Sequence, residues 1–266
     1  MICVLGDAHL DVVVRASWPL ATDTDTAART RLGLGGQGAN VAAWVVALGG
    51  RSRLIAARAT DLAADLVAAE LARRGVELVG PVIDGRTGVV VSISDGGTRR
   101  SMLTDRGVGP GLPAGSVRPG WLDECSWLHL PAYSLTGGPV QASAAAAAAA
   151  ARDRAARLSV DLSSVAAISG FGVTEFRRVL RDLAPDVVFG NKAEADLVGE
   201  LPGSELIVKL GPDGVLVAGQ HYPAASTEPA DATGAGDAFA AGYLVGGVEL
   251  GLTAAARAVA TIGAMP

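Results

Sequence analysis

The sequence predicts an α/β fold in which a mostly parallel sheet is covered by helices on both faces. Short apolar runs such as ICVLG (2–6), LSVDL (158–162) and ELIVKLG (205–211) alternate with longer segments of helical character along most of the chain. Hydrophobic residues make up 50% of the 266 residues and aromatic residues only 4%. A core rich in Ala and Val suits helices packed closely on a parallel sheet, so a three-layer αβα arrangement is expected.

The individual elements follow in chain order. The run at 2–6 is the first strand, and a helix is expected from about Asn40, behind the glycines of GLGGQGAN (33–40). The run at 52–60 leads to Asp61, a good N-cap for a helix that stops at Gly75. The Ala-rich segment 142–157 is a further helix, because Ala has the highest helix propensity. The remaining strands and helices are expected within 126–134, 158–164, 174–183, 185–191, 192–199 and 205–211.

Two segments interrupt this alternation. Residues 11–34 begin as a strand and then turn polar, and residues 87–105 form two β runs joined by the turn DGGT. A small β lid formed by about 11–34 and 84–107, inserted into a single domain over 1–266, would explain both. Ordinary surface loops with an extra edge hairpin are the alternative.

Charge, cysteine content and apolar patterning argue against several classes of protein and partner. The formal net charge of −5 gives no reason to expect nucleic acid or a membrane surface as a partner. Cys3 and Cys125 are too few and too isolated for a disulfide framework or a C-x-x-C metal site. The N-terminus lacks the basic region of a signal peptide, and no apolar run outside the Ala-rich segment is long enough to cross a membrane. A cytoplasmic protein is therefore expected.

The segment DATGAGDAFAAGYLVG (231–246) carries the strongest chemical signal. Gly234, Ala235 and Gly236 form a small-residue turn directly before a helix, where backbone N–H groups and the helix dipole together attract an anion. Asp237 follows in the first turn of that helix. An anion hole beside a carboxylate suits phosphoryl transfer, in which the carboxylate accepts the proton of the attacking hydroxyl. A glycine-rich helix start with an ordinary acidic residue is the alternative for Asp237 alone.

This segment resembles the C-terminal signature D-T-x-G-A-G-D of the ribokinase family, also called the PfkB carbohydrate kinases, with Ala232 in place of the usual Thr. GDAHLD (6–11), GGQGAN (35–40), NKAE (191–194) and VKLGPDGVLV (208–217) resemble other family segments in the same order. The resemblance implies a ribokinase-like αβα fold with a β lid. It also implies an ATP-dependent kinase that uses Mg²⁺.

The resemblance assigns site residues. It implies that Asp237 is the general base. It also implies that the anion hole is formed by the backbone amides of Gly234, Ala235, Gly236 and Asp237. The substrate-binding residues are Asp11, Gly35, Gly36, Gln37, Asn40 and Arg106. The nucleotide-binding residues are Asn191, Glu194, Lys209, Gly211, Gly214, Thr233 and Gly236. Glu194 is assigned to Mg²⁺ through water, and Asp231 is a candidate ligand for a monovalent cation such as K⁺.

Lys209 has a physical argument of its own. A Lys within an apolar strand is costly unless its ammonium reaches water or an anion, so Lys209 is expected to face the nucleotide. Asn191 and Glu194, taken alone, are equally well explained as a turn residue and a first-turn helix acid.

The predicted activity is phosphorylation of a hydroxyl on a small sugar or sugar acid of the ribose, fructose or 2-keto-3-deoxygluconate type. The low aromatic content disfavours the main alternative, a nucleoside kinase of the same family. An alternative of another class is an NAD(P)-dependent oxidoreductase, because Gly33, Gly35 and Gly38 match G-x-G-x-x-G. The segment TAARTRL before those glycines is a poor strand for that motif. Nucleic acid and membrane are not expected as partners, whereas a homodimer through the lid is.

Overall fold

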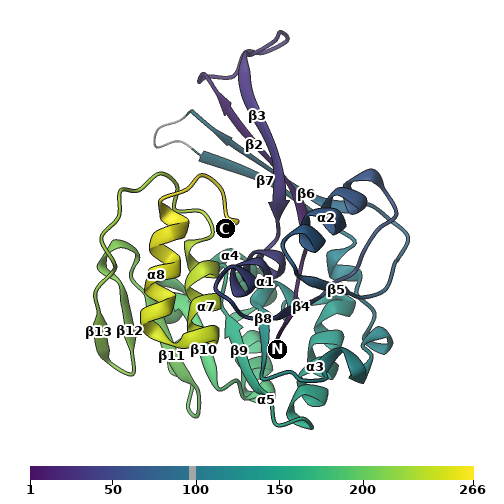
Figure 1. The fold of residues 1–266 in the computed structure, drawn as a ribbon, viewed down its shortest axis with the longest axis vertical. Helices are drawn as coiled ribbons and strands as arrows, with labels where there is room; N and C mark the ends of the chain where they lie inside the picture. The colour runs from purple at the N-terminus through teal and green to yellow at the C-terminus, as the bar shows by residue number, and fades with distance from the viewer. Residues whose placement is uncertain (96–99) are drawn as a thin grey trace.

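The computed structural model describes residues 1–95 and 100–266 and confirms the predicted α/β fold (Figure 1). In the described part of the chain, nine strands form one sheet in the order β13-β12-β11-β10-β9-β8-β1-β4-β5. All neighbours from β5 to β11 pair in parallel, and β12 and β13 pair antiparallel at one edge. The strands of this sheet are β1 (Ile2–Leu5), β4 (Ser52–Ile55), β5 (Glu77–Val79), β8 (Trp127–Pro131), β9 (Arg157–Asp161), β10 (Val187–Asn191), β11 (Glu205–Lys209), β12 (Val215–Val217) and β13 (Gln220–Tyr222).

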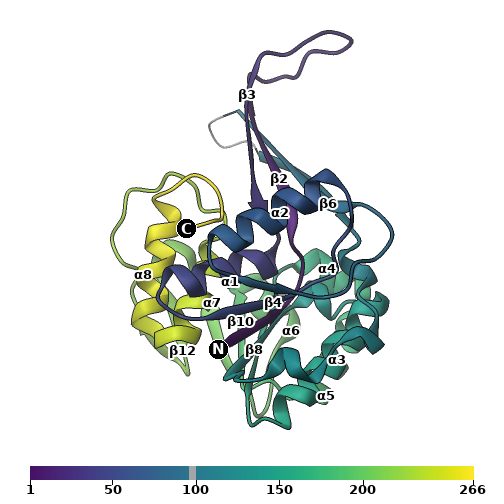
Figure 2. The same cartoon turned by 45° about the vertical axis from the view of Figure 1, so that its right-hand side comes forward.

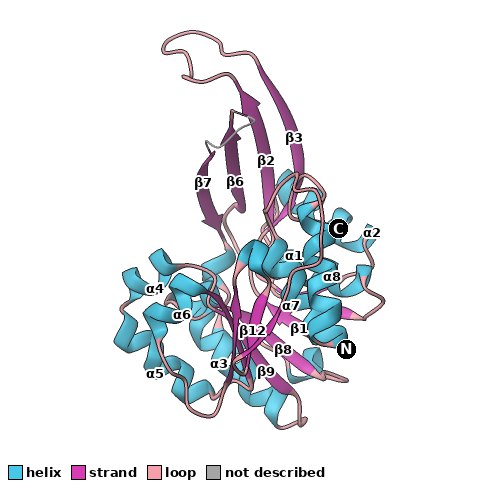
Figure 3. Ribbon diagram, turned by 90° about the vertical axis from the view of Figure 1, so that its left-hand side faces the viewer, coloured by secondary structure: helices cyan, strands magenta, loops and turns pink. Residues whose placement is uncertain are grey.

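Helices cover both faces of this sheet and complete the three layers (Figures 1 and 3). One buried cluster joins the sheet to α1 (Gln37–Ala47), α2 (Leu62–Arg73), α7 (Ala235–Gly246) and α8 (Val248–Val259). The other cluster joins the opposite face to α3 (Gly138–Arg152), α4 (Val165–Phe171), α5 (Val173–Leu183) and α6 (Lys192–Val198). Small side chains such as Ala144, Ala147 and Ala151 are fully buried, which lets the Ala-rich helix approach the strands closely.

A second sheet projects from one end of this body, as Figures 2 and 3 show from two sides. Its described strands lie in the order β3-β2-β6-β7, with bounds β2 (His9–Ala16), β3 (Ala28–Gly35), β6 (Thr87–Ser94) and β7 (Arg100–Gly107). The two segments that interrupt the strand–helix alternation therefore pair with each other. Turn residues 96–98 of the predicted hairpin lie outside the described residues. We call this four-stranded sheet the lid.

Local signals in the sequence explain several element ends. Asp61 caps α2 as predicted, because its side chain accepts a hydrogen bond from the Ala64 amide. The first helix begins at Gln37, earlier than the predicted Asn40, since Gly36 at φ +92° supplies the turn that starts it. The Ala-rich helix ends at Arg152, before the predicted Arg157, which belongs to β9. No helix among the described residues is both long and apolar enough to span a membrane.

Candidate active site

Asp237 lies in the first turn of α7 and faces α1. The Asn40 amide nitrogen donates a hydrogen bond of 2.7 Å to its Oδ2, and the nearby Gln37 side chain also favours the ionised form of Asp237. Burial raises the pKa of Asp237 to about 7, and the nearby charge of Asp161 adds to this, whereas the hydrogen bonds and Lys209 oppose it. A carboxyl group with a pKa near neutrality is suited to accept and release a proton at physiological pH.

The turn before α7 places backbone amides next to this carboxylate. Gly234 adopts the left-handed conformation (φ +76°), and a Cβ built there would lie 2.6 Å from Cα of Ala264. Only glycine fits this position without strain. The Ala235 amide donates a long bond of 3.3 Å to the carbonyl of Ala232, so it is the least available of the predicted anion-hole donors.

Most of the predicted substrate-binding residues lie where the lid joins the core. Asp11 of β2 and Gly35 of β3 sit in neighbouring strands, and a Cβ at Gly35 would lie 2.0 Å from Asp11 Oδ1. Gly36 is equally constrained, because its Cβ would lie 2.5 Å from the carbonyl oxygen of Asp7. The glycines of this segment thus make room for a carboxylate and for the backbone beside it. Asn40 is buried next to them, with 7% of its surface exposed.

Arg106 is the predicted substrate residue whose surroundings differ most from expectation. Its Nε donates a 2.7 Å hydrogen bond to the buried Asp7 Oδ2, and its Nη2 donates to the carbonyl of Tyr133. Burial opposes ionisation of Asp7, yet the His9 imidazole, whose Nε2 lies 3.5 Å from Oδ2, and the hydrogen bond from Arg106 keep its pKa below the ordinary value. Arg106 therefore fastens β7 of the lid to the end of β1. The sequence prediction gave no role to Asp7.

Asn191 and Glu194 lie together at the start of α6. The Asn191 side chain accepts from the Glu194 amide, and the Glu194 carboxylate accepts from the Asn191 amide, which is a capping box. The side chain of Glu194 is buried, and burial raises the pKa of its carboxyl group. The local interpretation, a turn residue and a first-turn acid, is thus correct for both residues. It leaves one Glu194 oxygen outside the capping box.

Lys209 ends β11 and reaches across β10 to Asp161, the last residue of β9, with 2.6 Å between Nζ and Oδ2. Despite burial, the charge of Asp161 raises the pKa of Lys209. A Cβ at Gly236 would lie 3.1 Å from Lys209 Nζ, so the ammonium lies against the first turn of α7. Asp161 was missed from the sequence, although an acidic residue closing an apolar strand near a strand lysine was a usable signal.

The remaining predicted residues have structural partners. Gly211 and Gly214 shape the turn between β11 and β12, with φ of +64° and +92°. Asp231 Oδ1 accepts from the amide and hydroxyl of Thr233, and its Oδ2 accepts from the Gly263 amide. These contacts attach the loop before α7 to Gly263.

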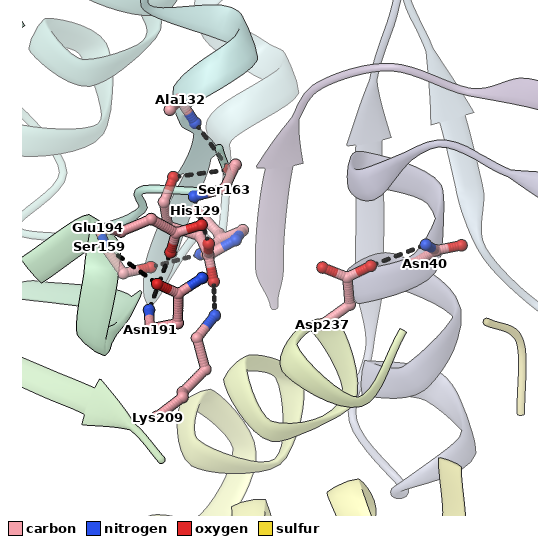
Figure 4. Close-up of polar contacts among 10 residues, drawn as sticks. Asn40, His129, Ala132, Ser159, Ser163, Asn191, Glu194, Lys209 and Asp237 are labelled. Atoms are coloured by element: carbon pink, nitrogen blue, oxygen red, sulfur yellow. Dashed lines mark hydrogen bonds and ion pairs between the residues drawn. The ribbon is translucent and has the colours of Figure 1, made fainter. Parts of the chain in front are cut away.

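The predicted residues form two separate groups near the start of α7 (Figure 4). One group holds Asp237 with Asn40, beside the lid. The other holds Lys209, Asn191 and Glu194 at the carboxyl ends of β9 to β11. Among residues 1–95 and 100–266, no three His, Cys, Asp or Glu side chains gather closely enough to hold a metal ion by themselves.

A model of the pfkB family of carbohydrate kinases matches residues 1–265 of this chain. The chain belongs to the pfkB carbohydrate kinase family. It is thus a phosphotransferase with a hydroxyl group as acceptor, and the oxidoreductase alternative is not supported. The structure gives the physical reason, because the strand before Gly36 is lid strand β3 and not a strand of the parallel sheet. A search of curated proteins found no match.

Solved structures share the fold of this pfkB family chain over its length. Adenosine kinase from Sinorhizobium meliloti is 23% identical, with a TM-score of 0.84 over 100% of this chain and 95% of that one. Ribokinase from Thermotoga maritima is also 23% identical, with a TM-score of 0.79 over 100% and 96%. An E. coli protein described as a ribokinase II, in complex with ATP and Mg²⁺, is 20% identical, with a TM-score of 0.82 over 99% and 94%.

Proposed function

We propose that this pfkB family kinase transfers the γ-phosphoryl group of ATP to a hydroxyl of a small sugar or sugar acid. The observation that carries the proposal is the position of Asp237, in the first turn of α7 beside the left-handed Gly234 and held by Asn40. In the reaction, Asp237 takes the proton of the acceptor hydroxyl, and that oxygen forms a bond to the γ-phosphorus. The bond between the γ-phosphorus and the bridging oxygen breaks, and ADP leaves.

The phosphoryl group has two kinds of positive partner in this arrangement. The amides of Gly234, Gly236 and Asp237 would stabilise its oxygens at the positive end of α7. The Lys209 ammonium lies against Gly236 and would approach the same oxygens. The turn at Gly211 and Gly214 follows Lys209 directly and would border the nucleotide. Thr233 would line the same side of the nucleotide.

The residues near α6 fit Mg²⁺. Mg²⁺ binds proteins through one or two carboxylates while keeping water and phosphate ligands, and Glu194 offers a buried carboxylate with one oxygen outside the capping box. Asn191 would help to order that water. Bound Mg²⁺ would neutralise charge on the ATP phosphates. A monovalent cation such as K⁺ is proposed to bind at Asp231. The Asp231 carboxylate would then bind the cation in addition to accepting its hydrogen bonds from Thr233 and Gly263.

The acceptor would lie between Asp237 and the lid. Asp11, Gly35, Gly36 and Asn40 together offer a carboxylate, an amide and a close approach to the backbone, which suits a polyhydroxylated molecule. The four described lid strands, His9–Ala16, Ala28–Gly35, Thr87–Ser94 and Arg100–Gly107, contain no Phe, Tyr or Trp. A purine would therefore find no Phe, Tyr or Trp ring on these strands to stack against, which favours a sugar over a nucleoside.

A panel of acceptors tests this proposal. ADP release from ATP and Mg²⁺ is measured with pentoses, hexoses, sugar acids and nucleosides, and the best acceptor is expected among the first three classes. Turnover confined to nucleosides would establish the alternative kinase. Tight binding of NAD(P) without binding of ATP in calorimetric titrations would contradict the proposal altogether.

The pH dependence of the reaction follows from Asp237. Because only the ionised carboxylate accepts a proton and its pKa is raised to about 7, kcat/KM is expected to rise with pH up to about 7 and to level off above it. An ordinary Asp, with a pKa of about 3.9, would give a flat profile between pH 5 and 8. The profile is measured with Mg²⁺ in excess, so that ATP stays complexed. A flat profile would show that Asp237 does not titrate in this range.

Gly35→Ala tests the acceptor side. Its Cβ would overlap the Asp11 carboxylate, which must rotate away, so the acceptor KM is expected to rise by roughly 10–100-fold, the value of a hydrogen bond to a charged group. The KM for ATP is expected to change little. Gly33→Ala is the matched control, since it lies in the same strand and a Cβ there meets nothing within 4 Å. Equal acceptor KM values for the two variants would contradict the role of Asp11.

A homodimer through the lid remains part of the proposal. On the lid face opposite Asp11, the strand register places Leu32, Val12, Val91 and Leu103 in one row. Leu32 and Leu103 are 60% and 59% exposed. An apolar row across a sheet is the type of surface that a second copy would cover.

A further inference from the structure

The buried ion pair between Asp161 and Lys209 has a property that phosphate binding alone does not require. Asp161 is almost completely buried, with 1% of its surface exposed, and Lys209 crosses the end of β10 to reach it. Such a pair is costly to bury compared with apolar side chains of similar size. An ammonium whose only task was to bind phosphate could stand free in water at the strand end.

Asp161 is itself held in one orientation. Its Oδ1 accepts a 2.9 Å hydrogen bond from the Ser163 amide, and the Ser163 hydroxyl donates back to the Asp161 carbonyl. Ser163 adopts a left-handed conformation (φ +62°) that closes this small loop. Oδ2 is thereby directed to Lys209. The carboxylate and the ammonium are both fixed at the base of the proposed phosphoryl site.

The charged and titratable groups around Asp237 can be assigned to elements. Asp161 of β9 and Lys209 of β11 both act on it electrostatically, whereas α1 presents only neutral Asn40 and Gln37. Further from Asp237, Glu194 of α6 faces Lys209. His129 of β8, hydrogen-bonded to Ser159, lies near Asp161, and burial lowers the pKa of its imidazole to about 4, so it is neutral. The two charges that act on Asp237 are therefore opposite and paired.

We infer that Asp161 is a positioning residue that fixes Lys209 against the first turn of α7 and masks the charge of its ammonium from Asp237. Without Asp161, Lys209 would carry an uncompensated positive charge beside the general base. That charge would favour the carboxylate over the carboxylic acid and make Asp237 a weaker base. With Asp161 in place, the ammonium is held for phosphoryl oxygens while Asp237 keeps its affinity for the proton. This inference rests on the proposed function.

The test compares the acid limb of kcat/KM against pH in the full-length enzyme. Asp161→Asn is expected to move that limb to lower pH, because the unmasked ammonium lowers the pKa of Asp237. The shift should be at least about 0.5 pH unit, as for a unit charge acting at an effective dielectric constant between about 20 and that of water. The double variant Asp161→Asn, Lys209→Met removes the unmasked charge and should move the limb back toward its original position.

Asp186→Asn is the matched control. Asp186 accepts a hydrogen bond from the Leu158 amide at the other end of β9, so its loss perturbs the same strand without changing charge near Asp237. Its acid limb should stay in place. An unmoved limb in Asp161→Asn, or a shift that persists in the double variant, would overturn the inference. Full activity of Asp237→Asn would instead overturn the proposed function, so the two failures are distinguishable.

Discussion

Replacing Asp237 by Asn is expected to reduce kcat by about 10²–10⁴-fold, the contribution of a positioned general base. Asn has the same shape, and its amide oxygen can still accept the hydrogen bond from Asn40, so the start of α7 should keep its structure. It cannot take a proton from the acceptor hydroxyl. ATP and acceptor should therefore still bind, which isothermal titration calorimetry measures separately from turnover.

A matched control is available for this variant on another helix. Asp196→Asn changes the same side chain on α6, where Asp196 forms an exposed ion pair with Lys192. Such pairs contribute little, so turnover and thermal stability should both remain close to those of the parent protein. Near-normal kcat in Asp237→Asn would remove Asp237 from its assigned role.

Gly234→Ala is expected to lower both turnover and stability. An Ala in the left-handed conformation costs roughly 1–2 kcal/mol, and its Cβ would overlap Ala264, so the turn before α7 must move. Moving the turn misdirects the amides that would hold the phosphoryl oxygens, and losing one such donor costs about 10²–10³-fold in kcat. Steady-state kinetics and a thermal melt measure the two effects, and the melting temperature should fall by a few degrees.

Gly203→Ala separates strain from catalysis. Gly203 has a similar φ of +89°, but a Cβ there meets nothing within 4 Å. This variant carries the same conformational cost without touching the site, so it should lose stability and keep its kcat. If Gly234→Ala also kept its kcat, the amides of this turn would have no part in phosphoryl transfer.

Local sequence patterns predicted the elements well, because capping and turn chemistry act over a few residues. Asp61 shows this at the start of α2, and Asn191 with Glu194 shows it at the start of α6. The lid was predictable in outline, since both of its segments interrupt the strand–helix alternation. The register that pairs β2 with β6 was not, because it depends on residues about 80 positions apart.

The contacts between side chains of the candidate site were harder to predict than the candidate residues themselves. Asp237 and Asn40 were both expected there, yet nothing in either segment indicates that their side chains bond to each other. Arg106 was expected at the acceptor, but a buried carboxylate at Asp7 competes for its guanidinium. Asp161 was not predicted, because its partner Lys209 is distant in the sequence. The partner of this strand-end acid is evident only from the sheet order, which places Lys209 two strands away.

The Asn40–Asp237 hydrogen bond joins residues 197 positions apart, and this separation has a consequence for biosynthesis. Translation delivers the proposed acceptor residues early, with the lid and α1, whereas the proposed base, Asp237, arrives only with α7. A nascent chain that ends before α7 thus lacks the proposed base, Asp237. Under the proposed function, such a chain would not transfer phosphoryl groups from ATP until α7 and α8 have packed against the sheet.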